Sequence, residues 1–166
     1  MKRSQNTEKL IRTGLRHIKG YASILPLEVL SEHTGVPTEG MVKLDGNENP
    51  YGCSPRVRNA LSSYPHYHIY PDPEQRELRR ALEKYVGVPT DHIVVGSGSD
   101  ELIDLILRLF IEPGDEVINC IPTFGMYPFS TEVCGGRVNN VPRDKNFAVD
   151  VIAAKKAINE RTKVMF

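Results

Sequence analysis

Apolar and polar residues alternate along the second half of the chain in a regular rhythm. Four short apolar runs predict buried strands, at 93–95, 116–120, 138–141 and 163–166. Longer helical patterns separate them, at 99–111, within 122–133 and from Asp150 to about Asn159. Strands that alternate with helices are typical of a mostly parallel sheet with helices on its faces. We therefore expect an α/β fold.

Three helices are predicted upstream of Gly87. A short helix at 26–33 begins near Pro26, and a second begins after Pro55, with apolar residues at 57, 60, 61 and 64. For the third, Asp72 is the expected N-cap, Pro73 the first helical residue and Gln75 the partner in a capping box. Its expected buried stripe consists of Leu78, Ala81, Leu82 and Tyr85.

Composition excludes several classes of protein. Among 166 residues, 21 basic side chains balance 21 acidic ones, which argues against a dedicated nucleic-acid binder. No apolar run is long enough to span a membrane, and the start MKRSQNTEK lacks the apolar core of a secretory signal. Three widely spaced cysteines indicate neither a disulfide framework nor a zinc site, so we expect a reducing, cytoplasmic location. The basic segment 1–20 is expected to be a solvated arm rather than a transit peptide.

The segment V-V-G-S-G-S-D-E-L-I-D, residues 94–104, predicts a strand, a tight glycine turn and the start of a helix. Free N–H groups and the positive end of a helix dipole at such a turn bind phosphate. The segment matches neither a dinucleotide fingerprint nor a Walker A loop. The alternative is a plain turn, with Asp100 and Glu101 stabilised in the first helical turn. The helix itself is apolar on nearly every side, which predicts central burial.

Three further segments carry candidate chemistry, each with a structural alternative. Asn47 and Glu48 in L-D-G-N-E-N-P-Y-G would offer polar and anionic groups to a cationic substrate, or simply form a turn. Tyr70, before Pro71-Asp72-Pro73, would donate its hydroxyl to a phosphate or pack on a helix. Phe124, after a predicted strand, would stack on a planar cofactor or join the core. His66 and His68 lack an acid or a cysteine at ligand spacing, so we expect no metal site.

Taken in order, four motifs resemble those of histidinol-phosphate aminotransferases over about residues 15–166: D-G-N-E-N-P-Y-G, I-Y-P-D-P, V-G-S-G-S-D-E-L-I-D and I-P-T-F-G-M-Y. The resemblance implies a pyridoxal-phosphate-dependent aminotransferase with the aspartate-aminotransferase fold. It implies part of a three-layer α/β/α large domain at 56–166, and an N-terminal arm and extended segment at 1–55. The implied reaction converts histidinol phosphate and 2-oxoglutarate to imidazole-acetol phosphate and glutamate, in histidine biosynthesis.

The resemblance also implies roles for individual residues. The cofactor phosphate would lie on the backbone at Ser99, Asp100 and Glu101, and Phe124 would stack on the pyridine ring. In a homodimer, Tyr70 would reach the phosphate held by the partner subunit. The substrate side chain would meet Tyr21, Asn47 and Glu48.

The family's cofactor-binding lysine, its aspartate on the pyridine nitrogen and its substrate-carboxylate arginine would all follow a strand like 163–166. We therefore expect a fragment that carries no catalytic residue and is inactive alone. A threonine-phosphate decarboxylase or an aromatic aminotransferase of the same fold stays open. So does a non-catalytic domain that binds phosphate or a protein partner.

Overall fold

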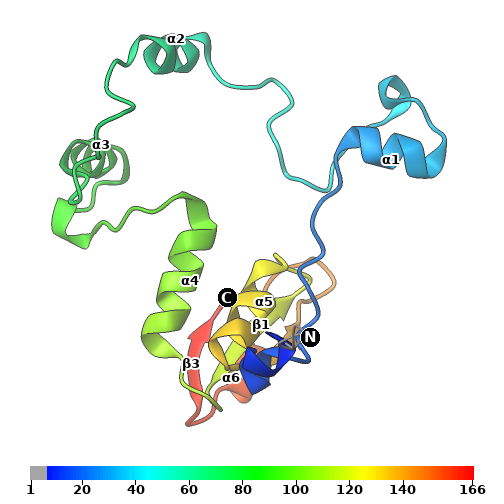
Figure 1. The fold of residues 1–166 in the computed structure, drawn as a ribbon. Coiled ribbons are helices and arrows are strands. Elements are labelled where there is room, and N and C mark those ends of the chain that lie inside the picture. The colour runs from blue at the N-terminus through cyan, green and yellow to red at the C-terminus, as the bar shows by residue number, and fades with distance from the viewer. Residues whose placement is uncertain (1–6) are drawn as a thin grey trace, which may run out of the picture. The chain divides into compact units, whose positions relative to one another are not determined.

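The computed structural model describes residues 7–166, which form two compact units. One unit contains the residues up to Ala22 together with Val94–Phe166, and the other contains Ser23–Ile93 (Figure 1). The first six residues of the predicted basic arm lie outside the described residues. The domain boundary predicted after residue 55 falls inside the second unit and stays a prediction.

The first unit is built on a parallel sheet of three strands. They are β1 (Glu116–Ile121), β2 (Arg137–Pro142) and β3 (Thr162–Met165), in the order β2-β1-β3. Both neighbours run parallel to the central strand β1, and Val117 pairs with Val138 and with Val164. These strands confirm three of the four predicted apolar runs.

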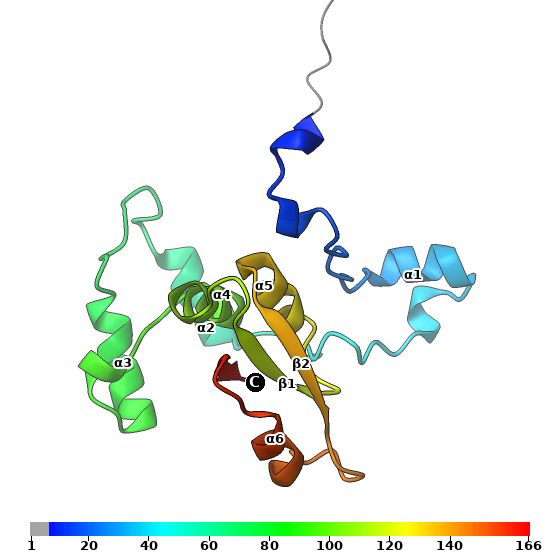
Figure 2. The same ribbon diagram turned by 90° about the horizontal axis from the view of Figure 1, so that it is seen from below.

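Helices cover both faces of this sheet (Figure 2). On one face, α4 (Gly98–Phe110) and α5 (Met126–Cys134) pack on Val117 through a core that includes Ile103 and Leu107. On the other face, α6 (Val151–Ala157) packs Ala154 against Ile118 and Cys120. Successive residues of β1 thus supply opposite cores, as the period of two in a strand requires. The arrangement confirms the predicted α/β class.

Local sequence explains where α5 ends and where α6 begins in the first unit. Gly135 ends α5 in the left-handed conformation, with φ of 90°, which glycine adopts without steric cost. Asp150 caps α6, because its side chain accepts a hydrogen bond from the backbone N–H of Ala153 at 2.9 Å. Both signals were predicted, although α6 ends two residues before Asn159.

The second unit contains the three predicted upstream helices: α1 (Leu27–Thr34), α2 (Pro55–Ser63) and α3 (Arg76–Val86). Left-handed glycines, Gly35 and Gly87, end the first and the third. Two 3-10 turns, Thr38–Gly40 and Thr90–His92, also belong to this unit, whereas Thr7–Leu10 and Thr13–Leu15 form 3-10 turns in the first unit.

Four sequence predictions about the elements are wrong. Residues 93–95 form no strand, because no described strand pairs with them. The third helix begins at Arg76 rather than after Asp72, with Gln75 left-handed at its N-cap. Its expected buried stripe is open, since Leu78 and Tyr85 are exposed. The predicted central burial of α4 fails too, because among its apolar side chains only Ile103 and Leu107 are buried.

None of the helices within residues 7–166 has the length and apolar character needed to cross a membrane. In the same range, no three or more His, Cys, Asp or Glu side chains are placed to hold a metal ion.

Candidate active site

The amino end of α4 offers backbone donors without acceptors. Ser97, the N-cap residue, makes no side-chain capping bond. Within residues 7–166, the N–H groups of Ser99 and Asp100 donate no hydrogen bond. Gly98 has a φ of 79° and open space where a Cβ would stand, so the approach is clear. The five residues 111–115 reverse the chain into β1, which places this helix end at the carboxyl edge of the sheet (Figure 1). A phosphate monoester fits such a position.

Glu101 takes a different position from its two neighbours. Its carboxylate folds back and accepts a hydrogen bond from the N–H of Ser97. A Cβ added to Gly96 would lie 2.8 Å from Glu101 Oε2, so a larger residue there would displace this carboxylate. The side chain of Glu101 therefore holds the glycine turn, and its predicted contact with a cofactor stays a prediction.

Phe124 lies where its prediction placed it, in the loop that follows β1. Its ring is 42% exposed and meets Tyr127 edge to face, with centroids 5.7 Å apart. Tyr127 in turn stacks on Phe166 at 4.3 Å, with the rings parallel. Phe124 thus contacts the core through Tyr127, while much of the residue stays open to a ligand.

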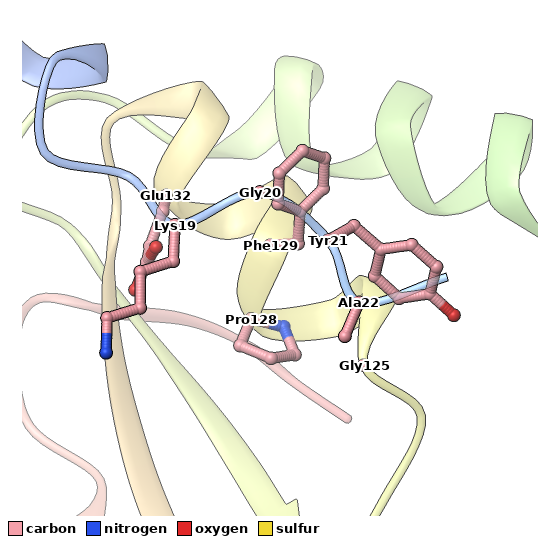
Figure 3. A pocket seen from close by; sticks show the side chains of 8 residues that line it. All are labelled: Lys19, Gly20, Tyr21, Ala22, Gly125, Pro128, Phe129 and Glu132. Carbon is pink, nitrogen blue, oxygen red and sulfur yellow. The ribbon is translucent and has the colours of Figure 1, made fainter. Parts of the chain in front are cut away.

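Tyr21 lies next to the start of α5. Its ring packs on Phe129, with centroids 6.1 Å apart, and a Cβ at Gly125 would come within 3.1 Å of Tyr21 Cε2. Figure 3 shows the segment 19–22 passing over α5, beside a cavity of about 340 Å³ that Lys19 and Glu132 flank. Because Gly125 follows Phe124, the structure places Tyr21 against the residue adjacent to the candidate stacking ring.

In the second unit, Asn47 and Glu48 belong to a charged turn. Asn47 is left-handed, with φ of 49°. Lys43 Nζ lies 3.0 Å from Asp45 Oδ1 and 3.8 Å from Glu48 Oε2. The hydrogen bond from Lys43 holds the pKa of Asp45 below its usual value. Sequence reasoning missed Lys43, although the alternation of charges in K-L-D-G-N-E was a visible signal.

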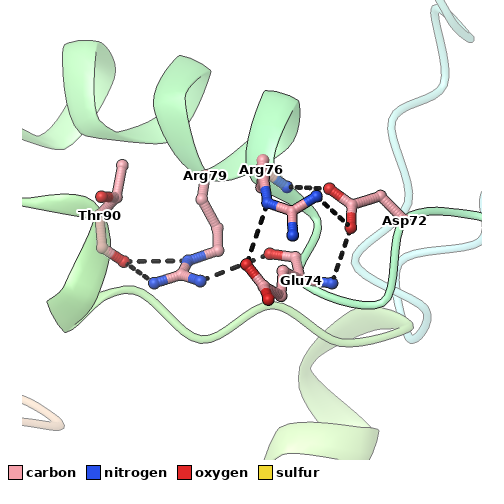
Figure 4. A network of polar contacts seen from close by, with 5 residues as sticks. All are labelled: Asp72, Glu74, Arg76, Arg79 and Thr90. Carbon is pink, nitrogen blue, oxygen red and sulfur yellow. Dashed lines mark hydrogen bonds and ion pairs between the residues drawn. The ribbon is translucent and has the colours of Figure 1, made fainter.

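Tyr70, also in the second unit, is 98% exposed, so its hydroxyl is open to a ligand. The chain directly after it is held firmly (Figure 4). Asp72 accepts hydrogen bonds from the N–H groups of Glu74 and Arg76, both at 3.1 Å, and these bonds lower the pKa of Asp72. Arg79 ties the same turn to the chain beyond the helix, since its guanidinium donates to the carbonyl oxygens of Glu74 and Thr90.

The candidate residues thus fall into two groups. Those in the first unit are Tyr21, Ser99, Asp100, Glu101 and Phe124, and those in the second are Asn47, Glu48 and Tyr70. Sequence reasoning missed Arg143, whose guanidinium donates to the carbonyl oxygens of Cys120 and Pro122 just before Phe124. A single arginine after a strand carries no motif that would have revealed this contact.

The chain is similar to known proteins over almost its whole length. Histidinol-phosphate aminotransferase of Dehalococcoides mccartyi is 49% identical over 161 residues, covering 97% of this chain and 44% of that protein. A chloroplastic histidinol-phosphate aminotransferase of Arabidopsis thaliana is 44% identical over 160 residues, covering 96% of this chain and 38% of that protein. The chain therefore spans less than half the length of these relatives.

Solved structures show the same fold. Histidinol-phosphate aminotransferase of Sinorhizobium meliloti, in complex with pyridoxal-5'-phosphate, has a TM-score of 0.62 at 26% identity and covers 75% of this chain and 34% of that one. Aspartate aminotransferase of Rhizobium meliloti has a TM-score of 0.72 at 21% identity, over 93% of this chain and 41% of that one. Residues 39–166 match the family described as aminotransferase class I and II, and the chain belongs to that family.

Proposed function

We propose that this chain is the amino-terminal part of a histidinol-phosphate aminotransferase, which exchanges an amino group between histidinol phosphate and 2-oxoglutarate. The identity of 49% to a protein of that name, sustained over 97% of the chain, carries the proposal. The chain's share of its relatives' length fits an incomplete enzyme, in which the remainder would supply the cofactor-binding lysine.

The residues present suit pyridoxal phosphate. The N–H groups of Ser99 and Asp100 would hold its phosphate, because they lack acceptors and lie at the positive end of the α4 dipole. The half-exposed ring of Phe124 would stack on its pyridine ring. When bound, pyridoxal phosphate supplies an electron sink for the carbanion that amino-group transfer requires. The residues named here would bind pyridoxal phosphate and orient its ring.

For the substrate, we propose contacts from Tyr21, Asn47 and Glu48. The Glu48 carboxylate is largely exposed, so a cationic substrate group can replace water around it and would share it with Lys43 Nζ, 3.8 Å away. An imidazolium or ammonium group would gain a charge-assisted hydrogen bond there. Tyr21 presents its ring from a fixed position against α5, which suits a flat side chain such as imidazole.

We further propose that the complete enzyme is a cytoplasmic homodimer in which Tyr70 reaches the cofactor phosphate of the partner subunit. The nearly complete exposure of Tyr70, on a turn pinned by Asp72, supports a role for its hydroxyl outside its own unit.

The test is a substrate panel on the complete enzyme loaded with pyridoxal phosphate. We expect glutamate to form from 2-oxoglutarate with histidinol phosphate as the preferred donor. Phenylalanine and threonine phosphate serve as competing substrates, the latter with carbon dioxide release as the readout. A preference for either competitor would overturn the proposed substrate, and a protein that binds no pyridoxal phosphate would overturn the enzyme class.

A further inference from the structure

Arg143 links three segments at the carboxyl edge of the sheet. Its backbone N–H donates to the carbonyl oxygen of Ile121 at 2.8 Å, extending the β1–β2 ladder by one step. Its Nε then donates to the carbonyl oxygens of Cys120 at 3.0 Å and of Pro122 at 3.1 Å. Its Nη1 donates to the carbonyl oxygen of Phe147 at 3.3 Å.

We propose that Arg143 is a positioning residue that fixes the loop carrying Phe124, and through it the cofactor ring. The proposal rests on the proposed function, since it assigns Phe124 to pyridoxal phosphate. The sequence reason lies at Pro122, which has no N–H and therefore cannot donate to a neighbouring strand. The carbonyl oxygen is therefore the one main-chain hydrogen-bonding group that Pro122 itself has, and Arg143 Nε donates to it.

The segment that carries the guanidinium is itself well ordered by hydrogen bonds. The Asp144 side chain accepts from the N–H groups of Asn146 at 2.8 Å and Ala148 at 2.9 Å. This closes residues 144–148 into a tight turn that presents the carbonyl of Phe147 to Arg143. The arginine therefore bridges two fixed points, which limits its own freedom as well as that of the loop.

Phe124 is then held from both sides. Upstream, Arg143 fixes Pro122, two residues before the ring. Downstream, the N–H of Tyr127 donates to the carbonyl oxygen of Phe124 at 3.3 Å, as α5 begins. A stacking ring that is already oriented loses less conformational freedom when a ligand binds, so the affinity for that ligand rises.

Arg161 provides a matched control at the opposite end of β1. Its guanidinium donates through Nε at 2.9 Å and Nη2 at 2.6 Å to the carboxylate of Glu116, the first residue of the strand. Both arginines thus stabilise one end of the same strand, but only Arg143 lies at the edge that carries Phe124. Loss of general stability should follow from either substitution, whereas loss of cofactor orientation should follow from one.

The experiment measures the dissociation constant of pyridoxal phosphate in the complete enzyme for R143M, R161M, F124A and R143M/F124A. We expect R143M to weaken binding about tenfold, the loss typical of a charge-assisted hydrogen bond, and R161M to change it less than about twofold, within the range of a remote surface substitution. R143M should add almost nothing to F124A, because both act through one ring. Full additivity, or equal effects of R143M and R161M, would overturn the positioning role.

Hydrogen exchange in the apoenzyme separates this idea from the proposed function. The two probes are the N–H groups at positions 143 and 127, which donate to the carbonyl oxygens of Ile121 and Phe124 on either side of the loop. Faster exchange in R143M than in R161M supports the loop's dependence on Arg143, and equal rates refute it. A wild-type enzyme that binds no pyridoxal phosphate would refute the proposed function, with the loop measurement still valid. If R143M does not fold, R143K replaces it, since lysine keeps the charge but cannot bridge the same acceptors.

Discussion

Glu116 shows how strongly a single side chain can be held at the amino end of the central strand β1. Its carboxylate accepts from Asn159 Nδ2 at 2.8 Å and from Arg161, and the residue is only 9% exposed. The hydrogen bond from Asn159, followed by that from Arg161, holds the pKa of Glu116 below its usual value of 4.5. A carboxyl group whose pKa is lower in the folded state stabilises the fold above its unfolded-state pKa, and this contribution disappears as the pH falls through the folded-state pKa.

We therefore predict that E116Q makes the complete protein less stable near neutral pH. The difference in unfolding free energy between E116Q and wild type should shrink as the pH falls below about 4.5, the usual glutamate range. The midpoint of urea unfolding, measured from pH 7 down to pH 3, checks this. E112Q is the control, because Glu112 is exposed. Two curves that stay parallel for E116Q and wild type would contradict the prediction.

The cysteines should differ in reactivity for reasons of environment. Burial, with a smaller effect from the charge of Asp104, raises the pKa of the Cys134 thiol, whereas Cys53 is exposed. Since the thiolate is the reactive form, a maleimide at pH 7.5 should label Cys53 at least about tenfold faster than Cys134. Peptide mass mapping over time gives the two rates. Equal rates would show that the site around Cys134 opens readily.

Among the elements, α6 depends most clearly on one cap. It has seven residues, too few to be stable by helix propensity alone, and the Asp150 carboxylate satisfies the N–H of Ala153. D150A should cost about 1 kcal/mol of unfolding free energy, and D150S should recover most of it, because serine also accepts at the N-cap. Urea unfolding of both variants measures this. A serine variant as weak as the alanine one would exclude capping as the cause.

The elements also show which features a sequence can predict. Apolar runs and local caps located β1, β2, β3 and α6 because each of these signals lies within a few residues. The strand predicted at 93–95 did not form, because a strand exists only through hydrogen bonds to a neighbouring strand and, within residues 7–166, these residues have none. The predicted start of α3 failed because Gln75 adopts the left-handed conformation, so the helix begins only at Arg76, whose N–H donates to the Asp72 carboxylate.

The candidate site divides in the same way. The free donors at Ser99 and Asp100 follow from a glycine turn before a helix, so the sequence alone predicted a fit for phosphate. The sequence did not predict the role of Arg143. Its partners Cys120 and Pro122 are separated from it by 23 and 21 positions along the chain, and only the pairing of the strands brings them together. Likewise, no pattern indicated that Tyr21 would pack on Phe129.

At the scale of the whole molecule, apolar surface is the main liability of the chain alone. Leu44, Tyr85, Val94 and Leu109 are all at least three-quarters exposed, and β3 lies at an edge of the sheet. Such surfaces and edges promote association. We predict that residues 1–166 produced alone form aggregates and do not transaminate, and that co-production with the remainder of the enzyme restores solubility. Light scattering after size exclusion tests this, and a monomer with one sharp unfolding transition would contradict it.

The last prediction concerns the proposed dimer. Tyr70 is exposed and is followed by a turn that Asp72 holds, so its hydroxyl is open to a phosphate oxygen from a fixed point of the backbone. A hydrogen bond to a charged group contributes about 1.5–3 kcal/mol, so Y70F should weaken pyridoxal phosphate binding roughly ten- to a hundredfold. The Y70F homodimer, with wild type as the reference, gives this loss directly.

A mixed dimer then decides which subunit provides the hydroxyl. One subunit carries Y70F, and the other keeps Tyr70 but lacks the cofactor-binding lysine expected in the remainder of the enzyme. The single site with a lysine then lies in the Y70F subunit. If Tyr70 acts across the interface, that site receives an intact tyrosine from its partner and binds the cofactor with wild-type affinity. If it binds as weakly as the Y70F homodimer, Tyr70 acts within its own subunit, and cofactor retention no longer depends on dimerisation through this residue.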